Sequence, residues 1–296
     1  MSTRVKIISS LGALSFLFFA SCTEKIPSIH LDRLFTLMPE SYTQLKFENR
    51  LVDEKSFNVF KYRNYYNGGG CAIGDLNNDG LPDVYLTSNQ EDNKLFLNKG
   101  SFKFEDVTAE AGVAGTHQWS TGASLVDLNA DGRLDIYVCN SGNNKGDDRA
   151  NELFINQGNE GDGVPRFKEA AAEYGVDDQG FSTHAAFFDY DRDGDLDLYV
   201  LNNAFRALST FDLAQNLREE RDNSGGGHKF YRNDNGKFVD FTAAAGIYST
   251  VIAFGLGVSV SDVNNDGWLD LYVANDFFER DYLYLNNHDG TFRESL

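Results

Sequence analysis

A nine-residue pattern, Asp-x-Asn/Asp-x-Asp-Gly-x-x-Asp, occurs four times in this chain and constrains its fold more than any other feature. The first Asp of the pattern recurs at intervals of 52, 62 and 73 residues. Intervals of this size are typical of repeat proteins in which each unit forms one supersecondary structure. We therefore expect a series of similar units. The four copies span residues 75–83, 127–135, 189–197 and 262–270.

Short apolar runs flank every copy of the motif and indicate β-strands. Each copy leads into a run of apolar, aromatic and β-branched residues, such as 135–138, and a second such run follows, such as 153–156. A Gly-containing turn and a third run come next, and a further apolar stretch, such as 122–126, precedes the motif. Runs of this length and composition are typical of buried strands. Each repeat therefore contains four short strands joined by tight turns.

Units of four strands at this period predict an all-β fold, a β-propeller in which each repeat forms one four-stranded blade. The alternative is a linear β-solenoid, whose repeats are shorter and more uniform. The unequal intervals are explained by insertions, the longest of which covers residues 203–227. Its apolar residues have helical spacing, and a Gly-rich run over 224–227 ends it. We expect one short helical insert there, which either packs over a propeller face or forms a lid for a partner.

The motif also has the composition of a calcium-binding hairpin loop. Positions 1, 3, 5 and 9 supply side-chain oxygens, the Gly at position 6 permits a sharp turn, and position 7 contributes its main-chain carbonyl. Oxygen ligands without His or Cys favour Ca²⁺ over transition metals. The predicted ligands are Asp75, Asn77, Asp79, Leu81, Asp83, Asp127, Asn129, Asp131, Arg133, Asp135, Asp189, Asp191, Asp193, Asp195, Asp197, Asp262, Asn264, Asp266, Trp268 and Asp270.

Two other interpretations of the motif are weaker. An EF-hand needs a bidentate Glu at position 12, which is excluded because position 12 is Leu86, Val138, Val200 or Val273. Asp-Asn-Gly runs also form plain turns, but a turn alone does not explain an Asp three residues after every Gly. Clustered carboxylates repel one another without a cation. The sequence therefore favours Ca²⁺ in a structural role, in which each ion stiffens one hairpin.

At these motifs the sequence resembles the FG-GAP/VCBS repeat family, the calcium-loop propellers that include the heads of integrin α-subunits. Residues 65–75, 119–122 and 135–142 are similar to segments of large bacterial VCBS proteins of the ASPIC/UnbV and cartilage acidic protein group. The resemblance implies a propeller of about seven blades, calcium at the loops named above, and a binding role on a surface or in secretion. The fourth repeat stops at Leu296 and no ASPIC/UnbV region is present. We therefore expect an incomplete propeller from the N-terminal part of a longer product.

The first residues have the pattern of a bacterial lipoprotein signal. A basic start precedes an apolar run over 7–20, too short to span a membrane as a helix, and Ser21-Cys22 follows. We expect a lipid anchor on Cys22 and a place in the cell envelope, at the outer membrane or cell surface; an ordinary signal peptide and secretion are the alternative. Cys71 and Cys139 are expected to be buried free thiols. The predicted domains are a signal over 1–21, an N-terminal segment or partial blade over 22–66, and propeller repeats over 67–296.

Charge and motifs limit the classes of function. A net charge of −19 disfavours nucleic-acid binding, which needs a basic surface. We expect no enzyme, because no GxSxG, HExxH or P-loop motif is present; a polysaccharide-active enzyme is the less favoured alternative. The leading hypothesis is an anchored module that binds a protein or a glycan, and the other alternative is a structural or assembly domain of a larger protein. Candidate contact positions are His117, Trp119, His184 and the insert over 203–227.

Overall fold

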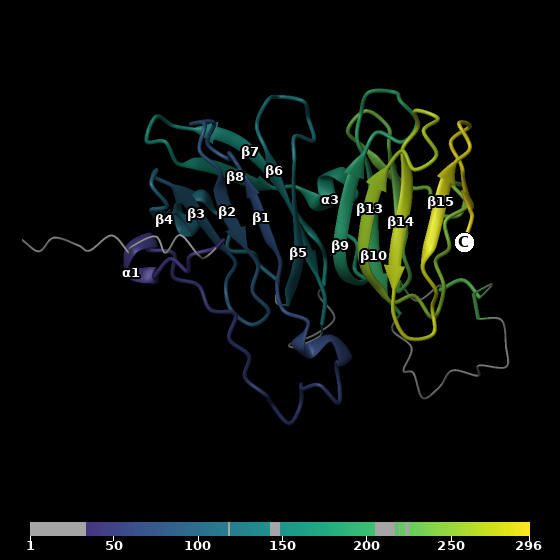
Figure 1. Cartoon of the computed structure of the whole chain (residues 1–296), viewed down its shortest axis with the longest axis horizontal. Coiled ribbons are helices and arrows are strands. Elements are labelled where there is room, and N and C mark those ends of the chain that lie inside the picture. Colours follow the sequence, from purple (N-terminus) through teal and green to yellow (C-terminus); the bar gives the residue numbers. More distant parts are fainter. Residues whose placement is uncertain (1–33, 118, 143–148, 205–216, 219, 223–224) are drawn as a thin grey trace, which may run out of the picture. The chain divides into compact units, whose positions relative to one another are not determined.

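Figure 1 shows the computed structural model of the chain, which describes residues 34–296 apart from 118, 143–148, 205–216, 219 and 223–224. The chain divides into two compact units, Met1–Met38 and Pro39–Leu296. The described part of the first unit forms neither helix nor strand. All the elements named below belong to the second unit. Within the described residues, no helix is long and apolar enough to cross a membrane.

The second unit contains four antiparallel sheets, and each sheet has four strands in chain order (Figure 1). We call them blades 1 to 4, because such sheets are the units of a β-propeller. Blades 1 and 2 consist of β1 (Cys71–Gly74), β2 (Asp83–Leu86), β3 (Lys94–Asn98), β4 (Phe104–Asp106), β5 (Ser120–Val126), β6 (Asp135–Asn140), β7 (Glu152–Asn159) and β8 (Pro165–Glu169). Blades 3 and 4 consist of β9 (Phe181–Phe188), β10 (Asp197–Asn203), β11 (Lys229–Asn233), β12 (Phe238–Asp240), β13 (Gly255–Ser261), β14 (Asp270–Asn275), β15 (Tyr282–Asn286) and β16 (Phe292–Glu294). The predicted all-β class with four-stranded repeats is confirmed.

The helices are single turns. They are α1 (Glu40–Thr43), the 3-10 helix η1 (Arg63–Tyr66), α2 (Thr108–Ala111) and α3 (Ala171–Tyr174). The turns α2 and α3 follow the last strands of blades 1 and 2, and each ends at a Gly in left-handed conformation, Gly112 (φ 76°) and Gly175 (φ 79°). Glycine is favoured at such a position because a Cβ would make the left-handed conformation unfavourable. The helix expected within 203–227 falls largely outside the described residues.

Hydrophobic cores lie between successive blades and hold them together. The Tyr in the middle of each second strand shows the arrangement, because Tyr85, Tyr137 and Tyr199 are fully buried against side chains of the following blade. The equivalent residue of blade 4, Tyr272, is 40 % exposed. None of the described residues forms a further blade against it. The same repeat position is therefore a core residue three times and a surface residue once.

The segment before blade 1 is held by aromatic packing. Between residues 34 and 66 the described chain contains α1 and η1 and no strand. Phe57, Tyr62 and Tyr65 surround Trp119, with ring centroids 5.0, 5.5 and 4.9 Å from the Trp119 ring. Trp119 precedes β5 directly and is buried. This residue, a candidate for ligand contact in the sequence, therefore attaches the N-terminal segment to blade 2.

Candidate metal centre

The four acidic loops each connect the first and second strands of one blade, as the strand pattern predicts. Adjacent loops also touch. The side-chain amide of Asn78 donates to the carbonyl of Gly132 at 3.0 Å, which joins the first loop to the second. The guanidinium of Arg192 lies 4.6 Å from the ring centroid of Trp268, which joins the third loop to the fourth.

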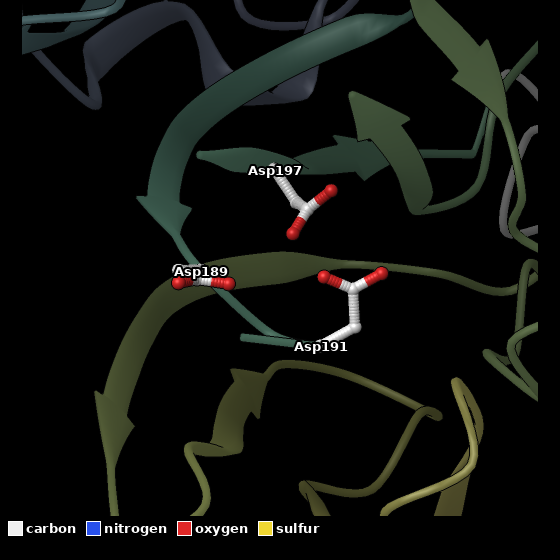
Figure 2. A group of neighbouring side chains, drawn as sticks. All are labelled: Asp189, Asp191 and Asp197. Atoms are coloured by element: carbon white, nitrogen blue, oxygen red, sulfur yellow. The ribbon is translucent and has the colours of Figure 1, made fainter. Parts of the chain in front are cut away.

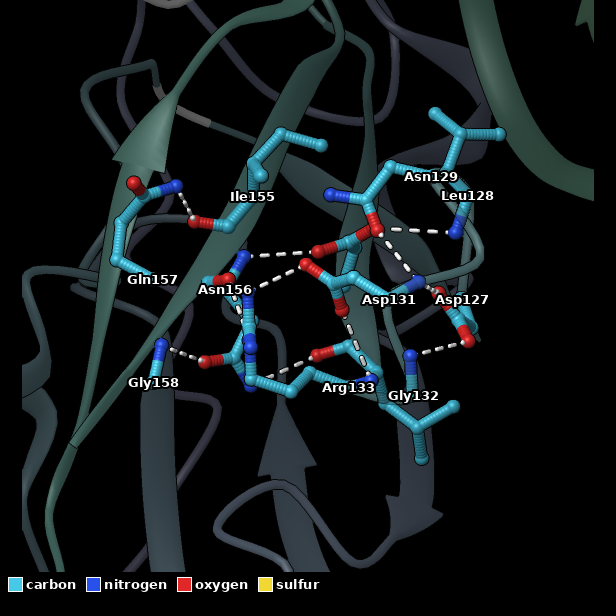
Figure 3. Close-up of polar contacts among 12 residues, drawn as sticks. Asp127, Leu128, Asn129, Asp131, Gly132, Arg133, Ile155, Asn156, Gln157 and Gly158 are labelled. Atoms are coloured by element: carbon cyan, nitrogen blue, oxygen red, sulfur yellow. Dashed lines mark hydrogen bonds and ion pairs between the residues drawn. The ribbon is translucent and has the colours of Figure 1, made fainter.

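The second loop shows how the chain curls (Figure 3). The Asp127 carboxylate accepts the backbone N–H groups of Asp131 at 3.0 Å and Gly132 at 2.9 Å. Both Ala130 (φ 54°) and Gly132 (φ 82°) are left-handed. Asp75 and Asp262 accept the same pair of backbone bonds in their loops. The curl therefore needs a left-handed residue at position 4 as well as position 6, and the sequence reveals only the second.

The Asp at position 9 fastens each loop to its blade. One Asp135 oxygen accepts the backbone N–H of Leu128 at 3.1 Å, and the other accepts that of Asn156 at 2.8 Å. Asp135 is fully buried. The same two bonds recur in the other three copies, on Asp83, Asp197 and Asp270. A structural role therefore accounts for the recurrence of this Asp, which the motif by itself predicts to be a metal ligand only.

An Asn that recurs at the end of each third strand completes this attachment, and the motif itself does not include it. The side chain of Asn156 donates to the carbonyls of Leu76 at 2.9 Å and Leu134 at 3.1 Å, and its oxygen accepts the N–H of Gly158. These contacts connect β7 of blade 2 to the acidic loop of its own blade and to the acidic loop of blade 1. The signal available in the sequence was an Asn at the same place in every repeat, at 98, 156, 233 and 286.

The third loop contains the most carboxylates of the four. Every second residue from 189 to 197 is an Asp. Figure 2 shows the carboxyl groups of Asp189, Asp191 and Asp197 around a common space, and one oxygen of each lies within 4.8 Å of the others. One oxygen of Asp189 and one of Asp195 are buried without a hydrogen-bond partner. Buried polar atoms normally have partners. The unpartnered Asp189 oxygen and the oxygen-only donor set of this cluster both fit a hard cation such as Ca²⁺.

Burial disfavours the ionised form of the Asp at position 9 of these loops when no cation is bound. It raises the pKa of Asp83 and of Asp135 to about 6, although two backbone hydrogen bonds oppose the shift in each case. Burial raises the pKa of Asp197 further, to about 8, and the negative charges of Asp191 and Asp195 add to the effect. A bound cation would favour the ionised forms, because an opposite charge at short range lowers a carboxyl pKa.

Side chains of the protein take up part of the charge in the second and fourth loops. The guanidinium of Arg133 contacts the Asp131 carboxylate and donates to the Asn156 carbonyl at 3.1 Å. The ring of His288 contacts the Asp266 carboxylate at 2.9 Å. Among the described residues, the carboxylates that come together in one cluster are those of Asp189, Asp191 and Asp197. The ligand roles of these three and of the other predicted residues stay predictions.

The remaining candidate residues differ in how far they are buried. His117 and His184 are half-buried. Cys71 and Cys139 are free thiols; Cys139 is buried as expected, but Cys71 is exposed because it lies on the side of β1 that faces away from blade 2. Cys22 lies outside the described residues.

The fold and the loops together define a class, the repeat proteins built of propeller-type blades with acidic hairpin loops. The FG-GAP-like repeat model matches residues 75–138, 127–200 and 262–295, more than half of the sequence. The chain therefore belongs to the FG-GAP-like repeat family.

Among individual proteins, the chain is similar to cartilage acidic protein 1. It is 30 % identical to the protein from Xenopus tropicalis over 212 residues, which cover 71 % of this chain and 29 % of the relative. It is 30 % identical to the Homo sapiens protein over 157 residues, which cover 53 % of this chain and 22 % of the relative. The chain thus spans less than a third of the length of these relatives.

Proposed function

We propose that this chain is a calcium-stabilised, non-enzymatic binding module. The observation that carries the proposal is the third loop, where three carboxylates surround one space and one oxygen of Asp189, a member of this cluster, is buried without a partner. Asp189, Asp191 and Asp197 would hold Ca²⁺ through their side chains. Ca²⁺ suits this set because it takes six to eight oxygen ligands in flexible geometry.

The ion would act on the fold rather than on a substrate. It supplies positive charge to a loop of closely spaced carboxylates and links the end of β9 to the start of β10. We propose the predicted ligands of the other three loops as weaker sites. They contain fewer carboxylates, and in two of them Arg133 or His288 already contacts an Asp.

A rigid set of blades suits the presentation of loops to a ligand, because binding residues are concentrated on loops that a scaffold positions. We propose a protein or a glycan as the ligand. We also propose a lipid anchor on Cys22 and a place in the cell envelope, with secretion as the alternative; the motifs of the first 22 residues support this.

A second candidate function is a structural or assembly role within a larger protein. The exposed Tyr272 favours it, because the equivalent residues of blades 1 to 3 are buried by the next blade. The limited share of the relatives that the chain spans supports it as well.

The binding role is tested by passing the purified chain over immobilised glycans and envelope proteins, in millimolar Ca²⁺ and in EDTA. We expect retention in Ca²⁺ and release by EDTA. Asp191→Asn should make retention require more Ca²⁺, while Glu105→Gln, a change of an exposed carboxylate in β4, should not. No retention on any surface would contradict the binding role, and shortening of a polysaccharide would favour the enzyme alternative.

A further inference from the structure

Two adjoining cavities lie beside the segment that precedes blade 1. Their volumes are about 410 and 270 Å³, and Tyr62 and Asn64 line both. The larger cavity reaches His184 of β9, and the smaller one reaches Asn203 of β10. Cavities of a few hundred Å³ with a few polar groups are the usual form of a small-ligand site. None of the metal-loop residues lines either cavity.

Two polar side chains in these walls have unused hydrogen-bonding capacity. Asn203 is 3 % exposed, yet neither its amide nitrogen nor its oxygen has a partner. His184 is half-buried and stands where the equivalent residues of the other blades are glycines, namely Gly70, Gly122 and Gly257. Buried amide groups in folded proteins are almost always hydrogen-bonded. An unpartnered amide and an imidazole that replaces a glycine both point to a ligand rather than to packing.

The smaller cavity is positively charged in a strongly acidic chain. Lys61 and Arg63 line it, both are exposed, and no described carboxylate forms an ion pair with either. No Asp or Glu belongs to the described lining of either cavity. The Arg63 guanidinium lies 4.9 Å from the ring centroid of Phe277 and 5.4 Å from that of Phe254, which restricts its position. This arrangement suits an anionic group, because two cations without a counter-ion attract one.

The walls around these groups are aromatic. Phe181 and Phe254 line the smaller cavity, and Tyr62 lies between the two. The flat apolar faces of a sugar ring can pack against such aromatic walls. Its hydroxyl groups both donate and accept hydrogen bonds, so they can pair with the amide nitrogen and the oxygen of Asn203. We propose that the two cavities bind an acidic saccharide, with a uronate carboxylate at Lys61 and Arg63 and hydroxyl groups at Asn203 and His184. This proposal rests on the proposed binding function and names its ligand class.

Calorimetric titration with two matched probes tests the proposal. The probes are a trigalacturonate and the same trisaccharide with its carboxylates methyl-esterified, which keeps the rings and removes the charge. We expect the acid to bind, the ester to bind at least tenfold more weakly, and the affinity for the acid to fall as salt is raised.

Variants locate the site. Lys61→Gln/Arg63→Gln should weaken binding of the acid at least tenfold, while Lys237→Gln/Arg293→Gln, which removes two exposed cations outside the cavities, should change it less than twofold. Asn203→Leu should weaken binding but keep or raise the melting temperature, since it removes an unpartnered buried amide. A merely structural role for Asn203 would lower the melting temperature instead.

Equal binding of acid and ester, no binding of either, or an unchanged affinity in the Lys61→Gln/Arg63→Gln variant would overturn the proposal. These outcomes are separate from failure of the proposed function. A chain that binds no uronate but is retained on another glycan or protein surface in Ca²⁺ keeps its binding function and loses only this ligand class.

Discussion

Removal of the position 9 carboxylate should destabilise the fold whether or not calcium is present. In Asp135→Ala, the backbone N–H groups of Leu128 and Asn156 lose their acceptors inside a fully buried site. A buried donor left without a partner costs about 1–3 kcal/mol, so two of them predict a loss of about 2–6 kcal/mol in the free energy of unfolding. Asp135→Asn keeps one acceptor and should lose about half as much.

Chemical denaturation followed by far-ultraviolet circular dichroism, in EDTA, measures this loss. A shifted midpoint at unchanged slope reports stability alone. Glu105→Ala is the control, because it removes an exposed carboxylate that pairs with Lys99, and such a pair contributes at most about 1 kcal/mol. A loss below about 1 kcal/mol for Asp135→Ala, or a loss seen only with Ca²⁺ present, would refute the fastening role.

Two further predictions use other parts of the fold. Tyr137→Ala should lower the free energy of unfolding by about 3–5 kcal/mol, while Tyr272→Ala at the same repeat position should change it by under about 1 kcal/mol; similar losses in denaturation curves would contradict the blade packing. Burial lowers the pKa of His228 to about 4, against an ordinary value of 6.5, so the unfolded chain binds more protons between these values and stability falls as pH drops from 6.5 to 4. The ring accepts the Asn202 N–H and contacts the Asn275 side chain. The wild type should therefore lose about 3 kcal/mol in the free energy of unfolding over this range, and His228→Gln should not show this loss. Denaturation curves of both proteins at pH 7 and pH 4.5 measure it. An equal fall in the free energy of unfolding in the two proteins would refute the prediction.

The repeat made the architecture predictable. Apolar runs with a β-branched or aromatic residue identify the strands, and the run at 135–138 is continuous because this strand is buried on both faces. The Gly at position 6 identifies the loop because few other residues adopt its backbone conformation. These are local signals, and they recur four times, which separates them from chance.

The details that depend on distant contacts could not be read from the sequence. Asp135 resembles a fourth metal ligand because its partners, Leu128 and Asn156, come together only when three strands are paired. Trp119 resembles a contact residue because the segment that buries it lies more than 50 residues earlier in the chain, at Tyr62 and Tyr65. The unpartnered amide of Asn203 has no signal in the sequence at all.

Thermal unfolding of the chain in EDTA and in saturating Ca²⁺ tests the central claim most directly. At a Ca²⁺ concentration of 100 times Kd, one site adds about 2.7 kcal/mol, which for a chain of this size raises the midpoint by about 5–10 °C. Asp191→Asn should reduce the rise, because it removes one of the three carboxylates that surround the third-loop space. A cooperative transition at the same temperature in EDTA and in Ca²⁺ would contradict the account.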